Sequence, residues 1–316
     1  MLIEAARGCD SVVAAGALQI ATRSVSEALA IPYVFTAYCP AVLPSPVHPP
    51  PKMGTHYAQS LSSETNASLW VEEEQSWNGL FRDALNEERA KLNLAPVESV
   101  RRDIFTDNPW LAADRTLGAA GKSTEMQVFQ TGAWFLDDPS TLPDEVEEFL
   151  AKGEPPVYFG FGSMRAPDGA SRVLIEAARA LGLRSIISGG WANLRSVDSG
   201  SDCVSVGDIA HEKLFPRVAA VVHHGGAGTT TAAARAGRVQ VVVPRLYDQF
   251  YWSYRVEQLG VGVAVAGPED LTVSAITTAL RQCLSPSVTE CALALAGRID
   301  LQGPQRAAAR LVERDG

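Results

Sequence analysis

The second half of the chain alternates short, wholly apolar runs with helical stretches, and this alternation constrains the fold more than any other feature. The apolar runs are continuous, as in parallel strands covered on both faces, where no position faces water. Helices between successive strands predict a doubly wound α/β domain with a parallel sheet. We expect strands at residues 157–162, 184–188, 203–206, 219–223, 239–243 and 261–266, and helices that include 171–181 and 229–236.

The first third contains one similar unit and then becomes irregular. Apolar runs at 12–16 and 33–38 flank a helical segment at 17–30, which predicts a strand–helix–strand unit. A proline-rich stretch at 40–51 can form neither a strand ladder nor a helix interior, so we expect a surface loop. Residues 69–94 are rich in Glu, Arg, Ala and Leu and favour a helix.

The composition shifts between these two parts, and the shift predicts the domain organisation. Residues 130–156 combine prolines, glycines and an acidic helical segment, which is typical of a linker. We therefore expect an N-terminal domain at 1–136, a linker at 137–154 and a C-terminal domain with terminal helices at 155–316. A length of 316 residues agrees with two domains at about 150 residues each.

Charge and cysteine usage exclude several classes of protein. The chain carries 27 Lys and Arg against 36 Asp and Glu, a net charge of −9, which argues against nucleic-acid binding. No apolar run approaches the roughly 20 residues of a membrane helix, and the first residues lack the pattern of a signal peptide. We therefore expect a cytoplasmic protein without membrane or nucleic-acid partners. Five scattered cysteines then predict free thiols: Cys9, Cys39, Cys203, Cys283 and Cys291.

The segment VVHHGGAGTTTAAARAG, residues 221–237, carries the strongest chemical signal. A buried strand runs into glycines, which let the backbone approach an anion, and then into a helix whose first N–H groups are unpaired. Thr229 and Thr230 would cap that helix or bond a phosphate, and His223 and His224 add donors that can gain charge near an anion. A tight strand-to-helix turn is the structural alternative. The segment matches neither the Walker pattern nor G-x-G-x-x-G, which disfavours ATP and NAD.

Two further strand ends carry polar groups. FGFGSM, residues 159–164, places Ser163 after a strand, where it would donate to the same anion or close an ordinary turn. PRLYDQFYW, residues 244–252, places Asp248 and Gln249 after another strand. An acid and an amide suit sugar hydroxyls, because one accepts hydrogen bonds and the other both donates and accepts. The alternative role for Asp248 is a cap on the following helix.

The remaining strand ends add polar turns at 189–194 and 207–215, in the second of which we expect His211 to be a surface residue. In a doubly wound domain all these segments meet at the carboxyl edge of the sheet, where ligands bind. The sequence contains no G-x-S-x-G segment and no cluster with metal-ligand spacing. Chemistry without a covalent nucleophile or a metal fits best.

With these motifs in place, the chain resembles a family 1 glycosyltransferase of the two-domain B-type fold. It is most similar to the bacterial branch that glycosylates glycopeptide aglycones of the vancomycin and teicoplanin type. HHGGAGTT followed by DQ is specific to the superfamily. The proline-rich loop and the TDNPW segment are more specific to the glycopeptide branch. The matching segments are residues 31–51, 105–114, 130–136, 155–163, 223–230 and 248–251.

The resemblance implies two Rossmann-like domains and a role for individual residues. His224 would bond the α-phosphate of a nucleotide sugar, and the β-phosphate would lie at the helix start. The donor-binding residues implied in this way are Ser163 (phosphate), Trp191 and Ile209 (base and ribose), His224, Gly226, Gly228 and Thr229 (diphosphate), and Asp248 and Gln249 (sugar). The N-terminal domain would hold the acceptor, with the proline-rich loop in its wall.

The resemblance also implies the reaction: inverting transfer of a sugar, glucose by expectation, from a UDP- or dTDP-sugar to a phenolic hydroxyl of a glycopeptide aglycone. No metal and no cofactor would be needed, and we expect a monomer. Family members start with a glycine-rich loop that carries an Asp, a candidate base, and this chain has no such loop before its first strand, so we expect an incomplete N-terminal domain. Asp248 is then the candidate base as well as a sugar ligand.

Three alternatives stay open. The chain would bind a nucleotide sugar without turnover, or glycosylate another natural product such as a macrolide or a lipid, or act as a nucleotide-sugar epimerase.

Overall fold

The structure is a computed structural model that describes residues 2–16, 18–51, 62–121, 126–136, 138–267 and 270–313. Within these ranges the chain forms two compact units. Unit 1 contains the described residues of 2–51, 62–135 and 300–313, and unit 2 contains those of 136–299. Each unit is built on a parallel β-sheet, in agreement with the predicted α/β class.

Unit 2 contains a six-stranded parallel sheet, and every predicted strand is present. The strands are β5 (Val157–Gly160), β6 (Ser185–Ser188), β7 (Cys203–Val206), β8 (Ala220–His223), β9 (Val239–Val242) and β10 (Gly262–Ala264), in the order β10-β9-β8-β5-β6-β7. After β5, the chain adds β6 and β7 on one side of it, and then adds β8, β9 and β10 on the other side. The order therefore reverses between β5 and β8, and ligands of doubly wound domains bind outside the carboxyl ends of the strands at such a reversal.

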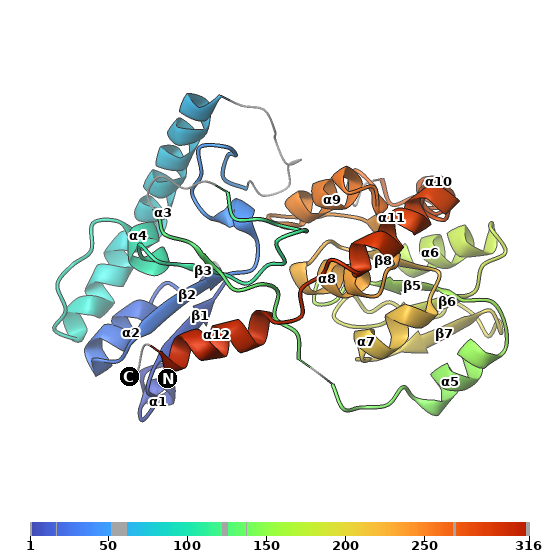
Figure 1. The fold of residues 1–316 in the computed structure, drawn as a ribbon, viewed down its shortest axis with the longest axis horizontal. Helices are drawn as coiled ribbons and strands as arrows, with labels where there is room; N and C mark the ends of the chain where they lie inside the picture. The colour runs from blue at the N-terminus through green and yellow to red at the C-terminus, as the bar shows by residue number, and fades with distance from the viewer. Residues whose placement is uncertain are drawn as a thin grey trace. The chain divides into compact units, whose positions relative to one another are not determined.

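Helices cover both faces of this sheet (Figure 1). They are α5 (Asp144–Ala151), α6 (Ala170–Arg179), α7 (His211–Leu214), α8 (Ala227–Arg235), α9 (Gln249–Gln258), α10 (Val273–Cys283) and α11 (Pro286–Ala296), with a 3₁₀ turn at Phe215–Arg217. Strands β5, β8 and β9 are buried along their whole length. This burial explains why they read as continuous apolar runs in the sequence.

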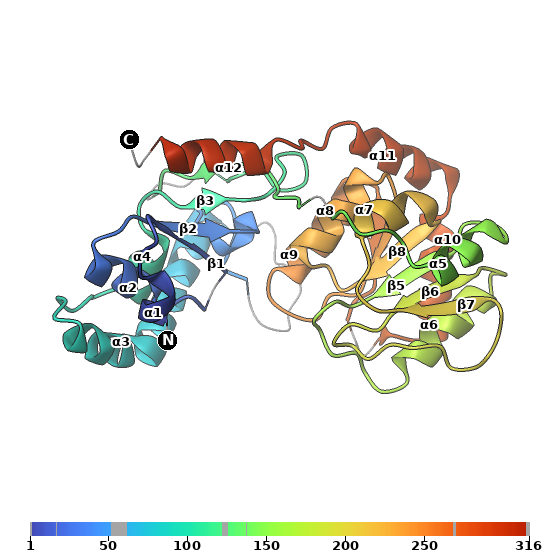
Figure 2. The ribbon, with the colours of Figure 1, turned by 90° about the horizontal axis from the view of Figure 1, so that it is seen from below.

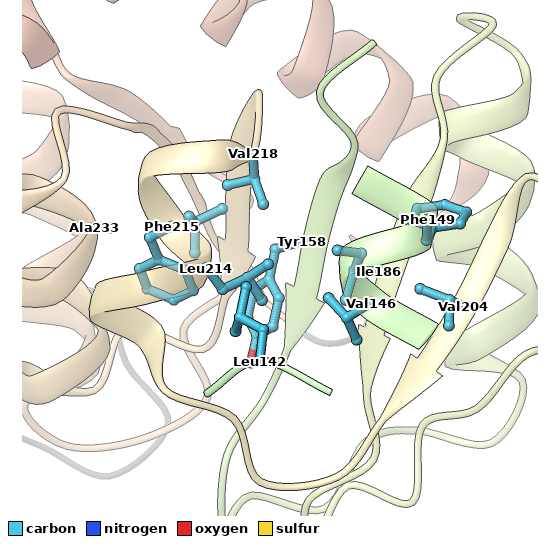
Figure 3. Packing of buried hydrophobic residues seen from close by; sticks show 11 residues of the cluster. Leu142, Val146, Phe149, Tyr158, Ile186, Val204, Leu214, Phe215, Val218 and Ala233 are labelled. Carbon is cyan, nitrogen blue, oxygen red and sulfur yellow. The ribbon is translucent and has the colours of Figure 1, made fainter. Parts of the chain in front are cut away.

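The predicted linker is wrong over much of its length, because α5 belongs to the core of unit 2. Figure 3 shows Val146 and Phe149 of α5 among side chains of the sheet and of α7. Leu142, just before α5, joins the same cluster. Burial of each such side chain contributes about 1.5–3 kcal/mol, which holds the segment against the sheet.

Unit 1 contains a four-stranded parallel sheet in the order β1-β2-β3-β4, of which Figure 2 labels β1, β2 and β3. The strands are β1 (Val12–Ala15), β2 (Tyr33–Ala37), β3 (Trp110–Leu111) and β4 (Phe129–Gln130), and the helices of the first half are α1 (Leu2–Ala6), α2 (Thr22–Leu29), α3 (Ser63–Lys91) and α4 (Val100–Phe105). The predicted strands β1 and β2 are confirmed. Helix α3 begins six residues before the predicted start, because the Ser62 hydroxyl caps it by accepting from the Thr65 N–H at 3.1 Å.

The last helix, α12 (Gly303–Val312), packs on unit 1, so the predicted C-terminal domain at 155–316 is wrong at its end. Ala307 of α12 lies against Val34 and Trp110 of the unit 1 sheet. Arg306 donates to the Thr131 carbonyl, and the Asp300 N–H donates to the Asp114 carboxylate at 2.9 Å. The chain therefore returns to unit 1 after unit 2 and packs α12 on its sheet.

The proline-rich stretch is mostly buried, which corrects the expectation of a surface loop. Prolines have no N–H, so the carbonyl groups here need donors from outside the segment. Two side chains of α3 supply them: Asn66 Nδ2 donates to the Pro46 oxygen at 2.9 Å, and Trp70 Nε1 donates to the His48 oxygen at 2.9 Å. The described part of the stretch is thereby packed against α3.

Candidate functional site

The loops after β5 and β8 meet at the point where the strand order reverses. Gly160 and His223, the last residues of these strands, are register partners in the sheet. The ring of His224 lies between two glycines of these loops. A Cβ added at Gly162 would lie 3.3 Å from His224 Cε1, and one added at Gly226 would lie 2.6 Å from His224 Nε2. The glycines thus make room for this ring at the carboxyl edge.

A second glycine requirement shapes the turn between β8 and α8. Gly225 has a φ of +90°, and a Cβ there would lie 2.8 Å from Val242 Cγ1 and 3.1 Å from the Gln249 oxygen. Any other residue would be strained and would collide with its neighbours. This glycine lets the chain turn from the end of β8 at His223 to the start of α8 at Ala227 within three residues.

The start of α8 offers unpaired backbone donors. Gly226 is the N-cap residue and supplies no side chain, while its oxygen accepts from the Thr230 N–H at 3.0 Å. The N–H groups of Ala227, Gly228 and Thr229 precede that first intrahelical bond and have no acceptor in the helix. Gly228 is exposed and Thr229 half-buried. Together with the helix dipole, these groups favour an anion at this point.

The two threonines at the helix start differ in their use. The Thr230 side chain is fully buried, and its hydroxyl donates to the Gly226 oxygen at 2.9 Å. The expectation that Thr230 caps the helix or bonds a phosphate is therefore wrong. Thr229 is half-buried and lies next to the exposed Gly228 in the first turn of α8.

The two adjacent histidines have opposite environments. His223 is fully buried: its Nδ1 accepts from the Gly225 N–H at 3.1 Å, so Nε2 carries the hydrogen and donates to Gln240 Oε1 at 2.9 Å. Burial lowers the pKa of His223 to about 3, so this side chain is a neutral structural support. The expectation that it serves as a donor to a ligand is wrong.

His224 lies at the site and keeps an unused nitrogen. Burial lowers the pKa of His224 to about 4, so the ring is neutral at pH 7. The expectation that this side chain readily gains charge is therefore wrong. Its Nδ1 is buried and has no hydrogen-bond partner among the described residues. An unpaired buried nitrogen is costly, and a ligand that pairs with it recovers that cost.

Asp248 and Gln249 follow β9 and begin α9. The Asp248 side chain makes no cap hydrogen bond, so the capping alternative is wrong, and burial raises its pKa to about 6. Gln249 is buried, and its Oε1 accepts from the N–H groups of Arg245 at 2.9 Å and Leu246 at 3.2 Å. The Gln249 oxygen therefore holds its own loop in shape, which leaves its amide nitrogen as a donor for a ligand.

The loops after β5 and β6 are tied together at the same edge. The Trp191 N–H donates to the Gly162 oxygen at 3.0 Å, while the Trp191 side chain is 79% exposed. A Cβ at Gly190 would lie 2.6 Å from that oxygen, so only glycine allows this approach. The glycine pair before Trp191 is the feature of the sequence that indicates this contact. Ser163 is exposed beside it.

The loop after β7 is more buried than expected. Ile209 is half-buried and packs against the core cluster of unit 2. His211 stacks on Phe215 with ring centroids 4.4 Å apart, and its Nε2 lies 3.2 Å from Tyr158 Oη. The expectation that His211 is a surface residue is wrong. Burial lowers its pKa, which keeps the ring neutral.

Two negative findings apply to the described residues. No three His, Cys, Asp or Glu side chains within them gather where they could hold a metal ion. No helix within them is both long and apolar enough to span a bilayer.

Comparisons with known proteins point to one family. A family model described as "Erythromycin biosynthesis protein CIII-like, C-terminal domain" matches residues 192–312. The vancomycin aglycone glucosyltransferase of Amycolatopsis orientalis is 45% identical over 311 residues, which cover 98% of this chain and 75% of that protein. The dTDP-epi-vancosaminyltransferase of the same organism is 42% identical, over 90% of this chain and 69% of that protein.

More distant relatives share part of the chain or the fold alone. A sterol 3-beta-glucosyltransferase of Saccharomyces cerevisiae is 40% identical over 43% of this chain and 13% of that protein. The solved structure of the glycosyltransferase of kitacinnamycin has a TM-score of 0.67 at 16% identity, covering 97% of this chain and 76% of that one. The solved structure of the glycosyltransferase VinC in complex with dTDP has a TM-score of 0.65 at 19% identity, covering 99% of this chain and 75% of that one.

The structure and the comparisons point to the same family. The parallel sheet has a reversal point beside the exposed start of α8, and two relatives above 40% identity align over 90% or more of this chain. This chain belongs to the family 1 glycosyltransferases of the B-type fold and groups with the glycosyltransferases of glycopeptide biosynthesis.

Proposed function

We propose that the chain binds a nucleoside diphosphate sugar at the carboxyl edge of the unit 2 sheet and transfers the sugar to a phenolic hydroxyl of a glycopeptide aglycone. The observation that carries this proposal is the start of α8, where unpaired backbone N–H groups follow His224, whose buried Nδ1 has no hydrogen-bond partner among the described residues. Neither a metal nor a cofactor enters the proposal.

The diphosphate is the part of the donor that this site suits best. Its β-phosphate would accept from the N–H groups of Gly228 and Thr229, and the α-phosphate would pair with His224. When the glycosidic bond breaks, the leaving diphosphate gains negative charge. Donors that are already in place stabilise that charge without further reorganisation. Ser163 would add a hydroxyl from the neighbouring loop.

The base and the sugar would lie on either side of the diphosphate. The exposed ring of Trp191 offers a stacking surface for a uracil or thymine base, with Ile209 next to the ribose. Asp248 and the amide nitrogen of Gln249 would bind sugar hydroxyls. We propose glucose from UDP-glucose, since the vancomycin aglycone enzyme is named a glucosyltransferase. A dTDP-sugar is the alternative, suggested by the dTDP-epi-vancosaminyltransferase.

The acceptor needs a base, because a phenol with a pKa of about 10 is protonated at pH 7. Asp248 is the one carboxylate that we place at this site. Its pKa of about 6 leaves it ionised at pH 7 and more basic than an ordinary aspartate. We assign it first to the sugar hydroxyls and second to the acceptor proton.

Transfer to a lipid-like alcohol is the second candidate, favoured by the similarity to a sterol glucosyltransferase. Incubation of the chain and UDP-glucose with a glycopeptide aglycone, a macrolide and a sterol, followed by mass analysis, separates the acceptors. We expect a mass gain of one hexose on the aglycone alone. Nucleotide binding without any product would identify a chain that binds the donor without turnover.

Thermal protection tests the donor site directly. We expect UDP to raise the Tm of the unaltered chain and to leave the Tm of His224→Ala nearly unchanged. Thr289→Ala, on α11, is the matched control and should keep the full protection. Equal protection of the unaltered chain and His224→Ala would contradict the assignment of His224.

A further inference from the structure

Trp252 lies one helical turn after Asp248 on α9. The backbone N–H of Trp252 donates to the backbone carbonyl oxygen of Asp248 at 3.1 Å. The two residues are four apart and therefore lie on one face of the helix. Side chains on a helix lean toward its N-terminus, so the indole of Trp252 covers the turn that holds Asp248.

The indole nitrogen of Trp252 is buried without a normal hydrogen bond. The residue is 1% exposed, and Nε1 has no partner of hydrogen-bonding geometry among the described residues. Tyr251 packs edge-on against the ring, with centroids 5.1 Å apart. Buried indole N–H groups usually find an acceptor, so this one calls for an explanation.

The Asp248 carboxylate is the acceptor within reach. Its side chain does not cap the first turn of α9. Burial raises the pKa of Asp248, and the backbone N–H of Asp248 itself and then the indole N–H of Trp252 oppose that rise. The indole N–H therefore lies close enough to act on the carboxylate, although the pair lacks the geometry of a full hydrogen bond. A small rotation of the carboxylate would complete the bond.

We propose that Trp252 is a positioning residue for Asp248: its Nε1–H holds one carboxylate oxygen, so that the other oxygen points to the hydroxyls of the donor sugar. This inference rests on the proposed function, since it concerns the sugar end of the same donor. The contacts proposed for the diphosphate are with His224 and the start of α8, and Trp252 is not among them. Loss of its N–H should therefore weaken recognition of the sugar and leave recognition of the nucleotide intact.

The test compares affinity for UDP-glucose with affinity for UDP, by calorimetry on the full chain, with dTDP-glucose and dTDP as a parallel pair. In Trp252→Phe, which keeps an aromatic ring, we expect UDP affinity within twofold of the unaltered chain. The UDP-glucose affinity should fall roughly tenfold, as for loss of a hydrogen bond to a charged group. Trp77→Phe on α3 is the matched control and should change neither affinity.

A second variant separates the N–H from the shape of the ring. Benzothienylalanine at position 252 replaces the N–H by sulfur and keeps the two-ring outline. We expect it to reproduce the selective loss of UDP-glucose affinity. Equal losses for UDP and UDP-glucose, or no loss in either variant, would overturn the positioning role. An unaltered chain that binds neither UDP nor dTDP would instead overturn the proposed function.

Discussion

His223 Nε2 donates to Gln240 Oε1 at 2.9 Å, and this bond joins β8 to β9 in the middle of the unit 2 sheet. Both side chains are completely buried. The bond fixes the His223 tautomer, which leaves Nδ1 free to accept from the Gly225 N–H and to hold the turn into α8. A buried pair in the sheet thus shapes the loop on which the candidate site depends.

Gln240→Leu should therefore destabilise the protein. It leaves the His223 N–H buried without an acceptor, which costs about 1–3 kcal/mol. Urea unfolding followed by far-UV circular dichroism measures the change. Gln258→Leu, at an exposed position near the end of α9, is the matched control and should change the free energy of unfolding by less than about 0.5 kcal/mol. Equal effects of the two substitutions would show that the bond across the strands contributes nothing.

The two buried histidines should make stability fall in acid. Their folded pKa values, about 3 for His223 and about 4 for His224, lie below the ordinary 6.5, so the unfolded chain binds more protons between those values. Their contribution is complete above pH 6.5 and is lost as the pH falls toward 4 and then 3. Asp248, whose pKa is raised from 3.8 to about 6, acts in the opposite direction between those two values.

His224→Ala isolates one of these contributions. As the pH falls from 6.5 to 4, the unfolding free energy of this variant should decline less than that of the unaltered chain, by up to about 1.4 kcal/mol per pH unit. Urea unfolding at pH 7, 6, 5 and 4 gives the two slopes. Parallel slopes would mean that His224 is not held neutral by burial.

Donor binding should depend on the ionisation of Asp248. The carboxylate form accepts from sugar hydroxyls, and its pKa is about 6, so UDP-glucose affinity should fall as the pH drops below 6. In Asp248→Asn the affinity should already be low at pH 7 and should lose this dependence. Calorimetry between pH 5 and 8 provides the measurement, and UDP serves as the ligand without a sugar. An unchanged pH dependence in Asp248→Asn would exclude this carboxyl as its source.

Gly225, in the turn before α8, and Gly228, in the first turn of α8, should differ sharply in their tolerance of alanine. Gly225→Ala places a side chain at a φ of +90° against Val242 and should cost about 2 kcal/mol or more. Gly228 lies in α8 with open space around it, so Gly228→Ala should leave stability unchanged or raise it by up to about 1 kcal/mol. Thermal unfolding of both variants decides. A Gly225→Ala variant as stable as the unaltered chain would show that the turn does not require glycine.

Much of unit 2 could be predicted from the sequence, because its strands are buried on both faces and read as unbroken apolar runs. Strands β3 and β4 were missed, since two residues each are too few to show a period. The place of α12 could not be predicted either. An apolar face shows that a helix packs, and only the three-dimensional structure shows that Ala307 meets Val34 and Trp110.

The candidate site was predicted in outline but not side chain by side chain. Adjacent residues at a strand end point to opposite sides, so of His223 and His224 only one could face a ligand. Gln240, a lone polar residue in an apolar strand, was the available signal that His223 turns inward. The buried oxygen of Gln249 and the buried hydroxyl of Thr230 depend on local backbone geometry, which sequence patterns do not encode.

The most direct test of the central claim is a crystal structure of the chain with UDP or dTDP bound. We predict diphosphate oxygens within hydrogen-bonding distance of the Gly228 and Thr229 N–H groups and of His224 Nδ1. A nucleotide bound elsewhere, with the start of α8 blocked or empty, would contradict the account.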